Sequence, residues 1–202
     1  MNRRAQKTKR EILDAVYALT KEKSFEQITV VDIVKCADIS RGTFYLHYED
    51  KYDLLNHIEN EISNFLHRNI EQTLVPNLTI EQMISKRRNA MLNVLTYLKE
   101  HKRELYVWIE GKSNSYIQQH LRSITEQIFE FTVAQAQLKP PSTLPMGLLA
   151  QLGSNIFMTV LNYWIQEDLQ TPPEDIVDLC VSLMTKGPLQ TLGLQLPESF
   201  KL

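Results

Sequence analysis

The residues best suited to molecular recognition lie in a short polar and aromatic stretch of the N-terminal region. Arg41, Gly42 and Thr43 occupy the first turn of an expected helix, where side chains and backbone N–H groups point outward past the cap. Glycine costs a helix about 1 kcal/mol relative to alanine, so Gly42 needs a reason. Close approach of the backbone to a nucleic-acid duplex is one such reason.

Aromatic residues with polar tips and a pattern typical of phosphate binding follow directly. Tyr45, His47 and Tyr48 each carry a hydrogen-bonding group on an aromatic body. Asp50 is expected to cap the next helix, and Lys51 stands at its first position. A helix N-terminus beside a lysine favours phosphate, because the helix dipole and the free N–H groups both attract an anion.

Two predicted helix N-termini define the structural setting of this polar and aromatic stretch. Thr29 is expected to cap the preceding helix, with Asp32 completing a weak capping box, and Ser40 is expected to cap the next. Hydrophobic residues flank both caps at the positions of a hydrophobic staple. Caps 11 residues apart leave room only for a sharp turn, which is the spacing of a helix-turn-helix whose second helix enters the major groove.

At these residues the chain resembles the TetR family of bacterial transcriptional regulators. The matching string runs from Thr29 through the turn at Ala37, and continues with Ser40-Arg41-Gly42-Thr43-Phe44-Tyr45, His47-Tyr48, Lys51 and Leu54-Leu55. The resemblance is strong over roughly the first sixty residues and only architectural beyond them. The turn usually carries glycine where this chain has Asp38, a residue that tolerates the left-handed conformation better than most.

The resemblance implies a DNA-binding surface. Arg41, Thr43 and Tyr45 would face the bases. Thr29, His47, Tyr48 and Lys51 would face the phosphates, and Ser40 and Gly42 complete the set as the cap and the glycine of the motif.

Helical spacing of apolar residues and sparse glycine predict an all-α chain. We expect an N-terminal three-helix DNA-binding domain with the helix-turn-helix over residues 1–56, and a larger helical domain for ligand binding and dimerisation over 57–202. The expected helices are 7–23, the two of the helix-turn-helix, 51–74, 80–100 behind a capping box of Thr79 and Gln82, 103–110 stopped by Gly111, 114–138 capped by Ser113, and 144–168 after a loop at 139–143. A last helix is expected to begin at the capping box Thr171-Pro172-Pro173-Glu174, with proline at its first helical position, and to end at Gly187 and Pro188.

The composition of the chain excludes some classes of function. A formal net charge of −2 over 202 residues argues against a nonspecific nucleic-acid packager, but not against a local DNA-binding face. Arg3, Arg4 and Lys7 are either a solvated tail or an arm that reaches phosphates. Cys36 and Cys180 are expected as buried free thiols in a reducing compartment. The chain shows neither a signal-peptide pattern nor a bilayer-spanning segment, so we expect a soluble cytoplasmic protein without membrane contact.

The last two long helices carry more apolar surface than one small domain easily covers. Ala150, Gly153 and Ser154 would let another helix approach closely. The resemblance implies that this pair forms a four-helix bundle with the same pair of a second subunit. A two-fold dimer would hold two recognition helices about 34–36 Å apart, one DNA turn.

A ligand cavity is the second expectation for the larger domain. Gln151, Asn155, Met158 and Asn162 lie on one side of an otherwise apolar helix, and their polar groups must find partners. The expected walls are Met91, Tyr106, Trp108, Tyr116 and Phe129, which could equally be ordinary core and dimer interface. Lys86, Arg87 and Arg88 are expected on a solvated face, although one arginine could turn inward toward an anionic ligand.

Catalytic and metal-binding patterns are missing from the sequence. It has no His/Cys pair at zinc spacing, no Gly-rich phosphate loop and no nucleophile beside a base, so we expect neither an enzyme nor a metal or other cofactor. The leading hypothesis is a homodimeric, sequence-specific transcriptional regulator of double-stranded DNA, a repressor released from a palindromic operator by a small-molecule effector. The alternatives are an all-helical protein–protein adaptor and a similar regulator controlled by a protein co-regulator.

Overall fold

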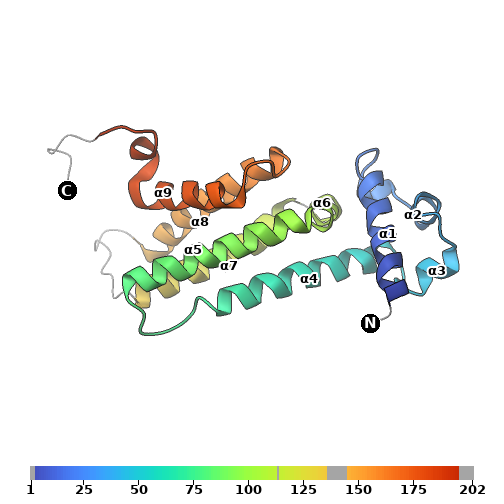
Figure 1. Ribbon diagram of the computed structural model, residues 1–202, viewed down its shortest axis with the longest axis horizontal. Coiled ribbons are helices and arrows are strands. Elements are labelled where there is room, and N and C mark those ends of the chain that lie inside the picture. Colours follow the sequence, from blue (N-terminus) through green and yellow to red (C-terminus); the bar gives the residue numbers. More distant parts are fainter. Residues whose placement is uncertain (1–2, 113, 136–144, 196–202) are drawn as a thin grey trace. The chain divides into compact units, whose positions relative to one another are not determined.

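The computed structural model describes residues 3–112, 114–135 and 145–195, and this part of the chain contains helices and connecting turns without a strand (Figure 1). The prediction of an all-α protein is therefore confirmed. The elements are α1 (Arg3–Leu19), the 3-10 helix η1 (Phe25–Gln27), α2 (Val30–Cys36), α3 (Arg41–Tyr45), α4 (Lys51–Glu71), α5 (Ile80–Glu100), α6 (Lys102–Gly111), α7 (Asn114–Gln135), α8 (Met146–Gln166) and α9 (Pro173–Thr191).

The chain forms two compact units. The N-terminal unit comprises Met1–His67 and Glu100–Ile117, and the C-terminal unit comprises Arg68–Lys99 and Gln118–Leu202. This division does not follow the one expected after residue 56, because α6 returns to pack on α1 and η1 in the N-terminal unit.

The N-terminal unit is built on a small apolar core. Its fully buried side chains come from every short element of the unit: Ile12 and Val16 of α1, Phe25 of η1, Ile33 of α2 and Phe44 of α3. Glycine allows α6 to approach α4 closely, since a Cβ on Gly111 would lie 2.6 Å from Cδ1 of Leu55. An ion pair of 3.0 Å between Lys112 and Glu59 closes the same contact.

The predicted caps of the helix-turn-helix are present. The Thr29 side chain accepts a hydrogen bond from the Asp32 N–H, and the Asp32 carboxylate accepts one from the Thr29 N–H, which completes the capping box. Ser40 Oγ accepts from the Thr43 N–H at 3.0 Å, and Asp50 caps α4 in the same way. Asp38 adopts the left-handed conformation expected of the turn, with φ of 52°.

Packing of α8 on α9 organises the C-terminal unit. Ala150 and Ser154 of α8 are buried, so these small residues lie within the unit itself. Trp164 is also fully buried, and its indole N–H donates to the Thr171 carbonyl at 2.8 Å. The capping box of Thr79 and Gln82 at the start of α5 is present as predicted.

Several expectations about helix ends were wrong. Pro172, not Thr171, is the N-cap of α9, and it makes no side-chain capping bond because proline has no side-chain acceptor. The main part of α9 does end at Gly187 as predicted, since this residue is non-helical with φ of 74°, and a short second helix follows from Pro188 to Thr191. The first helix spans 3–19 rather than 7–23, and α4 ends at Glu71 rather than near residue 74. The expected cap Ser113 and the loop at 139–143 lie outside the described residues.

The two cysteines differ in their surroundings. Cys180 is buried as expected, and burial raises the pKa of its thiol to about 12. Cys36 is exposed, contrary to expectation, because it is the last residue of α2, a short helix that turns Ile33 and Val34 inward. None of the described helices combines the length and the apolar character needed to cross a membrane.

Acid should weaken the helix-turn-helix through Asp32. The Lys23 ammonium lies 2.7 Å from the Asp32 carboxylate, and this contact, together with the hydrogen bonds from Thr29, holds the pKa of Asp32 well below its usual value. A depressed folded-state pKa stabilises the fold above the unfolded pKa, and this contribution is lost as the pH falls below about 4. We expect Asp32→Asn to lower the free energy of unfolding at pH 7, and to lower it less at pH 3, where the carboxyl of the unfolded chain is largely protonated.

Urea denaturation at the two pH values measures this difference. Glu26→Gln, at an exposed acid of η1, is the control. An Asp32→Asn effect of equal size at both pH values would contradict the prediction.

Candidate nucleic-acid interface

The short helix α3 presents its polar side chains outward. Arg41 and Gly42 are exposed, and 56% of Tyr45 is accessible, whereas Phe44 between them is completely buried. A helix of 5 residues is not stable on its own, so its position depends on the buried Phe44 ring and the Ser40 cap. The geometry leaves Arg41 and Tyr45 free to meet a surface outside the protein.

Gly42 has no role inside the fold. A Cβ built on it would meet only Ser40 Oγ, at 3.7 Å, which is ordinary van der Waals contact. Its backbone is helical, so no left-handed conformation requires glycine there. The remaining advantage of a missing side chain is close approach by another molecule.

Thr29 and Thr43 are already engaged in capping. The Thr43 hydroxyl lies 2.8 Å from Ser40 Oγ, and the Thr29 hydroxyl donates to the Asp32 carboxylate at 2.7 Å. The Thr29 hydroxyl would have to exchange its partner to donate to a phosphate, whereas in the Ser40–Thr43 pair either hydroxyl can be the donor. Among these cap residues, Thr29 and Ser40 are exposed.

Tyr48 packs inward, where the sequence predicted a phosphate contact. Only 5% of the residue is accessible, and its ring lies 5.9 Å from the Phe44 ring and 6.0 Å from that of His57. Burial raises the pKa of Tyr48 to about 12, with the charges of Glu61 and Asp53 adding to the shift. His47 is half-buried beside it, with ring centroids 6.4 Å apart.

Lys51 is held by the backbone of the segment before α2. Its ammonium donates to the carbonyl oxygens of Phe25, Glu26 and Ile28 at 2.9, 2.7 and 2.9 Å. These bonds use all three donors of the ammonium group, which also lies 5.0 Å from the centre of the Tyr52 ring. A phosphate contact, as predicted from the sequence, would require Lys51 to release at least one carbonyl.

Leu46 was missed by sequence analysis. It follows α3 directly, and 83% of it is exposed. An apolar residue beside a recognition helix can contact a thymine methyl group, so Leu46 belongs to the candidate surface. Its chemistry gave no signal, because an isolated leucine in a helical pattern indicates core.

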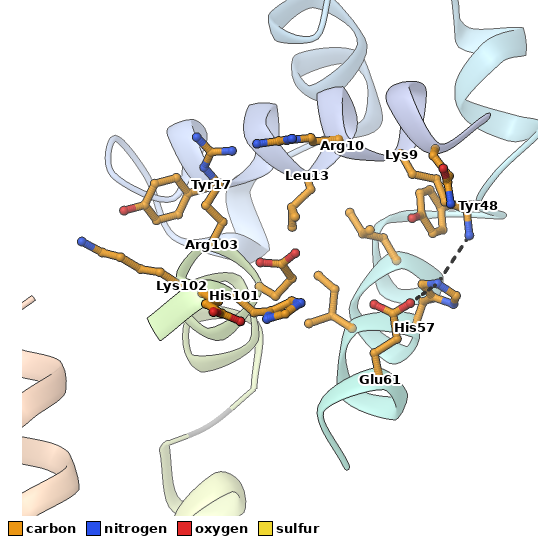
Figure 2. A pocket seen from close by; sticks show the side chains of 15 residues that line it. Lys9, Arg10, Leu13, Tyr17, Tyr48, His57, Glu61, His101, Lys102 and Arg103 are labelled. Carbon is orange, nitrogen blue, oxygen red and sulfur yellow. Dashed lines mark hydrogen bonds and ion pairs between the residues drawn. The ribbon is translucent and has the colours of Figure 1, made fainter. Parts of the chain in front are cut away.

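A polar cavity of about 850 Å³ lies in the N-terminal unit, lined by residues of α1, α4 and α6 (Figure 2). Lys9 Nζ lies 3.4 Å from His57 Nε2, and His57 Nε2 in turn lies 3.3 Å from the Glu61 carboxylate. Tyr48 also borders the cavity, with Lys9 Nζ 5.6 Å from its ring centre. The cavity therefore adjoins the inner side of the helix-turn-helix and is distinct from the one expected in the larger domain.

The residues expected to line a ligand cavity are divided between the units. Tyr106 and Trp108 belong to α6 in the N-terminal unit, where Trp108 is buried and Tyr106 lies 6.1 Å from the Tyr17 ring. Met91, Asn155, Met158 and Asn162 belong to the C-terminal unit, where Met158 is buried and Asn155 exposed. The side chains of Tyr116 and Phe129 lie outside the described part of the structure. Over the described residues, no group of three or more His, Cys, Asp or Glu side chains could hold a metal ion.

Comparison with known proteins covers both units. A family model described as "Bacterial regulatory proteins, tetR family" matches residues 12–58, and one described as "Transcriptional regulator C-terminal region" matches residues 85–186. The uncharacterized HTH-type transcriptional regulator YxbF of Bacillus subtilis is 22% identical over 167 residues, which cover 82% of this chain and only 42% of that protein. The chain thus corresponds to about two fifths of the length of this relative.

Solved structures share the fold over nearly the whole chain. NalD, the secondary repressor of the MexAB-OprM multidrug efflux pump in Pseudomonas aeruginosa, has a TM-score of 0.61 at 17% identity, with 92% of this chain and 98% of that chain covered. The transcriptional regulator FadR from Bacillus subtilis, solved in complex with stearoyl-CoA, has a TM-score of 0.62 at 20% identity, with 88% and 98% covered.

Substitution of Lys51 tests whether its ammonium holds the fold. Lys51→Met keeps much of the stem but leaves three carbonyl oxygens without their donor. We expect the free energy of unfolding to fall by about 1–3 kcal/mol, the usual range for losing a charged hydrogen-bond partner. Lys35→Met, at an exposed lysine of α2, should leave stability within about 0.5 kcal/mol. Equal stability of the two variants in urea denaturation would refute the structural role of Lys51.

Proposed function

From the membership of this chain in the TetR family of bacterial regulatory proteins, which are DNA-binding transcriptional regulators, we propose that it acts as a homodimeric repressor. A small molecule releases this repressor from a palindromic operator. The observation that carries the DNA-binding part is the geometry of α3. Arg41 and Tyr45 face outward from a helix anchored by the buried Phe44, and Gly42 leaves its backbone open to close approach.

We assign the residues of the interface to different tasks. Arg41, Thr43 and Tyr45 contact bases, with Leu46 adding an apolar contact. Thr29, His47 and the helix-capping segment at Ser40 and Gly42 contact the sugar–phosphate backbone. Tyr48 and Lys51 support this surface from within, and in this assignment they set the direction in which α3 faces. Residues 1–56 form the DNA-binding domain and 57–202 the regulatory domain.

An exposed apolar surface on α8 and α9 supports the dimer. Leu148, Leu152 and Tyr163 are exposed at helical spacing along α8, and Leu179 and Met184 are exposed on α9. Large apolar side chains left exposed at helical spacing are typical of a protein interface. A second copy of the same helix pair would cover it and fix two recognition helices at the separation of successive major grooves.

The regulatory domain binds the effector. The similar FadR structure contains stearoyl-CoA, and the present chain offers a half-buried Met91, a buried Met158 and a half-buried Asn162 in its C-terminal unit. Of the residues expected from the sequence, we retain those with described side chains in the C-terminal unit, Met91, Asn155, Met158 and Asn162, as candidate contacts. The effector must prefer the arrangement of the dimer that does not fit the operator, since equal affinity for both arrangements would change nothing.

DNA fragments selected from a random library by the purified protein test base recognition. We expect a palindromic consensus, and Arg41→Ala should cost about 1–3 kcal/mol of binding free energy and relax the preference at one position of each half-site. Arg122→Ala, at an exposed arginine of α7, is the control and should leave the affinity unchanged. If Arg41→Ala weakened binding equally for all sequences, Arg41 would be a phosphate contact. If the wild type selected nothing, the adaptor alternative would be favoured.

Sedimentation velocity tests the dimer surface. A glutamate in place of Leu152 would bury a charge in the proposed interface, so the dimer should dissociate at least tenfold more readily. Ile84→Glu, at a comparably exposed apolar residue of α5, should leave the dimer intact. A monomer mass for the wild type at all concentrations, or a dimer unaffected by Leu152→Glu, would refute this interface.

A further inference from the structure

The side chain of Arg87 on α5 is half-buried, and the C-terminal unit buries two of its guanidinium nitrogens without a partner. Its Nε and Nη2 atoms are both inaccessible to solvent, and neither makes a hydrogen bond within the described structure. Buried polar groups almost always have such a partner, and a buried unpaired charge is among the costliest features of a fold. The arginine therefore requires an explanation.

The sequence around Arg87 places it in an apolar face. Met83 lies one turn before it and Met91 one turn after it, and the same face continues through Leu95 and Leu98. Met83, Leu95 and Leu98 are buried, and Met91 is half-buried. A charged side chain at this position interrupts a stripe that would otherwise be continuous core.

Of the other cations of α5, Lys86 is exposed to solvent, and the two half-buried ones have partners. Arg88, the next residue, donates from its own Nε and Nη2 to the Asp178 carboxylate at 3.1 and 2.6 Å. Lys99 donates to the carbonyls of Gln170 and Thr171 at 3.3 and 3.4 Å. Burial lowers the pKa of the Arg87 guanidinium, with no compensating acid among the causes. Among the cations of α5, Arg87 is thus the one with buried nitrogen atoms that lack a partner.

We propose that Arg87 binds the anionic group of the effector, a carboxylate or a phosphate on an otherwise apolar molecule. The Nε and Nη2 edge of a guanidinium presents parallel donors that match two anionic oxygens, as no single lysine can. The methionines and leucines of the same face would contact the apolar body. This assignment rests on the proposed regulatory function of the domain and names the chemical class of its ligand.

The unpaired arginine also supplies the free-energy difference that regulation needs. In the ligand-free protein two nitrogens of the guanidinium are desolvated and unpaired, whereas an anion would pair them. An anionic effector therefore favours whichever arrangement of the regulatory domain admits it to Arg87. A neutral molecule of the same shape has no such preference.

Stability provides a test that needs no ligand. Arg87→Met replaces the buried charge by an apolar chain of similar length, and Arg88→Met makes the same change one residue on, where the guanidinium is paired. In a buffer of low anion concentration, Arg87→Met should leave the midpoint of thermal unfolding unchanged or raise it, and Arg88→Met should not raise it. A midpoint lowered by Arg87→Met as much as or more than by Arg88→Met would overturn the proposal.

Binding of matched probes supplies the second test. Decanoate, decyl phosphate and 1-decanol, below their aggregation concentrations, are titrated by calorimetry into the full-length wild type, Arg87→Met and Arg88→Met. Wild type and Arg88→Met should bind at least one anion about tenfold or more tightly than decanol, and Arg87→Met should bind all three equally. The better anion in the wild type separates a carboxylate effector from a phosphate one.

The outcomes separate this proposal from the function on which it rests. If the wild type binds no probe, or binds the anions no better than decanol, or if Arg87→Met keeps the preference, the assignment of Arg87 is wrong. Binding of the selected operator is measured for all three proteins without probe. Intact DNA binding with no anion preference refutes Arg87 alone, whereas absence of DNA binding in the wild type refutes the proposed function.

Discussion

A recognition helix of 5 residues has too few internal hydrogen bonds to hold its own shape, and the N-terminal unit is arranged to compensate for this weakness. The buried Phe44 ring anchors α3 to the core, and Ser40 holds its first turn. Lys51 then ties the start of α4 to the carbonyls that end η1. Because these contacts lie beneath the helix, Arg41 and Tyr45 point outward, and the position of α3 does not depend on hydrogen bonds from their side chains.

The same arrangement separates the residues that contact DNA from the residues that hold α3 in position. Tyr48 and Lys51 stand inside the recognition motif and carry polar tips, yet one is packed among aromatic rings and the other is saturated by carbonyl oxygens. Gly42 shows the converse, since nothing within the fold requires it. A motif residue can thus be needed for DNA binding because it orients the surface.

Arg87 and Arg88 make the corresponding contrast in the C-terminal unit. Adjacent residues of one helix point to different surroundings, so one guanidinium meets Asp178, while the other has two buried nitrogens without a partner. The paired arginine explains itself as part of the fold. The unpaired arginine is explained if its partner is the anionic group of a bound effector.

Local chemistry alone determined much of this protein. The caps at Thr29, Ser40 and Asp50, the left-handed Asp38 and the all-helical architecture depend on neighbouring residues, so the sequence predicted them. Tertiary structure decided what depends on distant partners: the carbonyls on Lys51, the burial of Tyr48, the exposure of Cys36, the return of α6 to the N-terminal unit and the choice of Arg87 as the inward arginine. Periodicity tells which residues share a helix face, but only packing decides what that face meets.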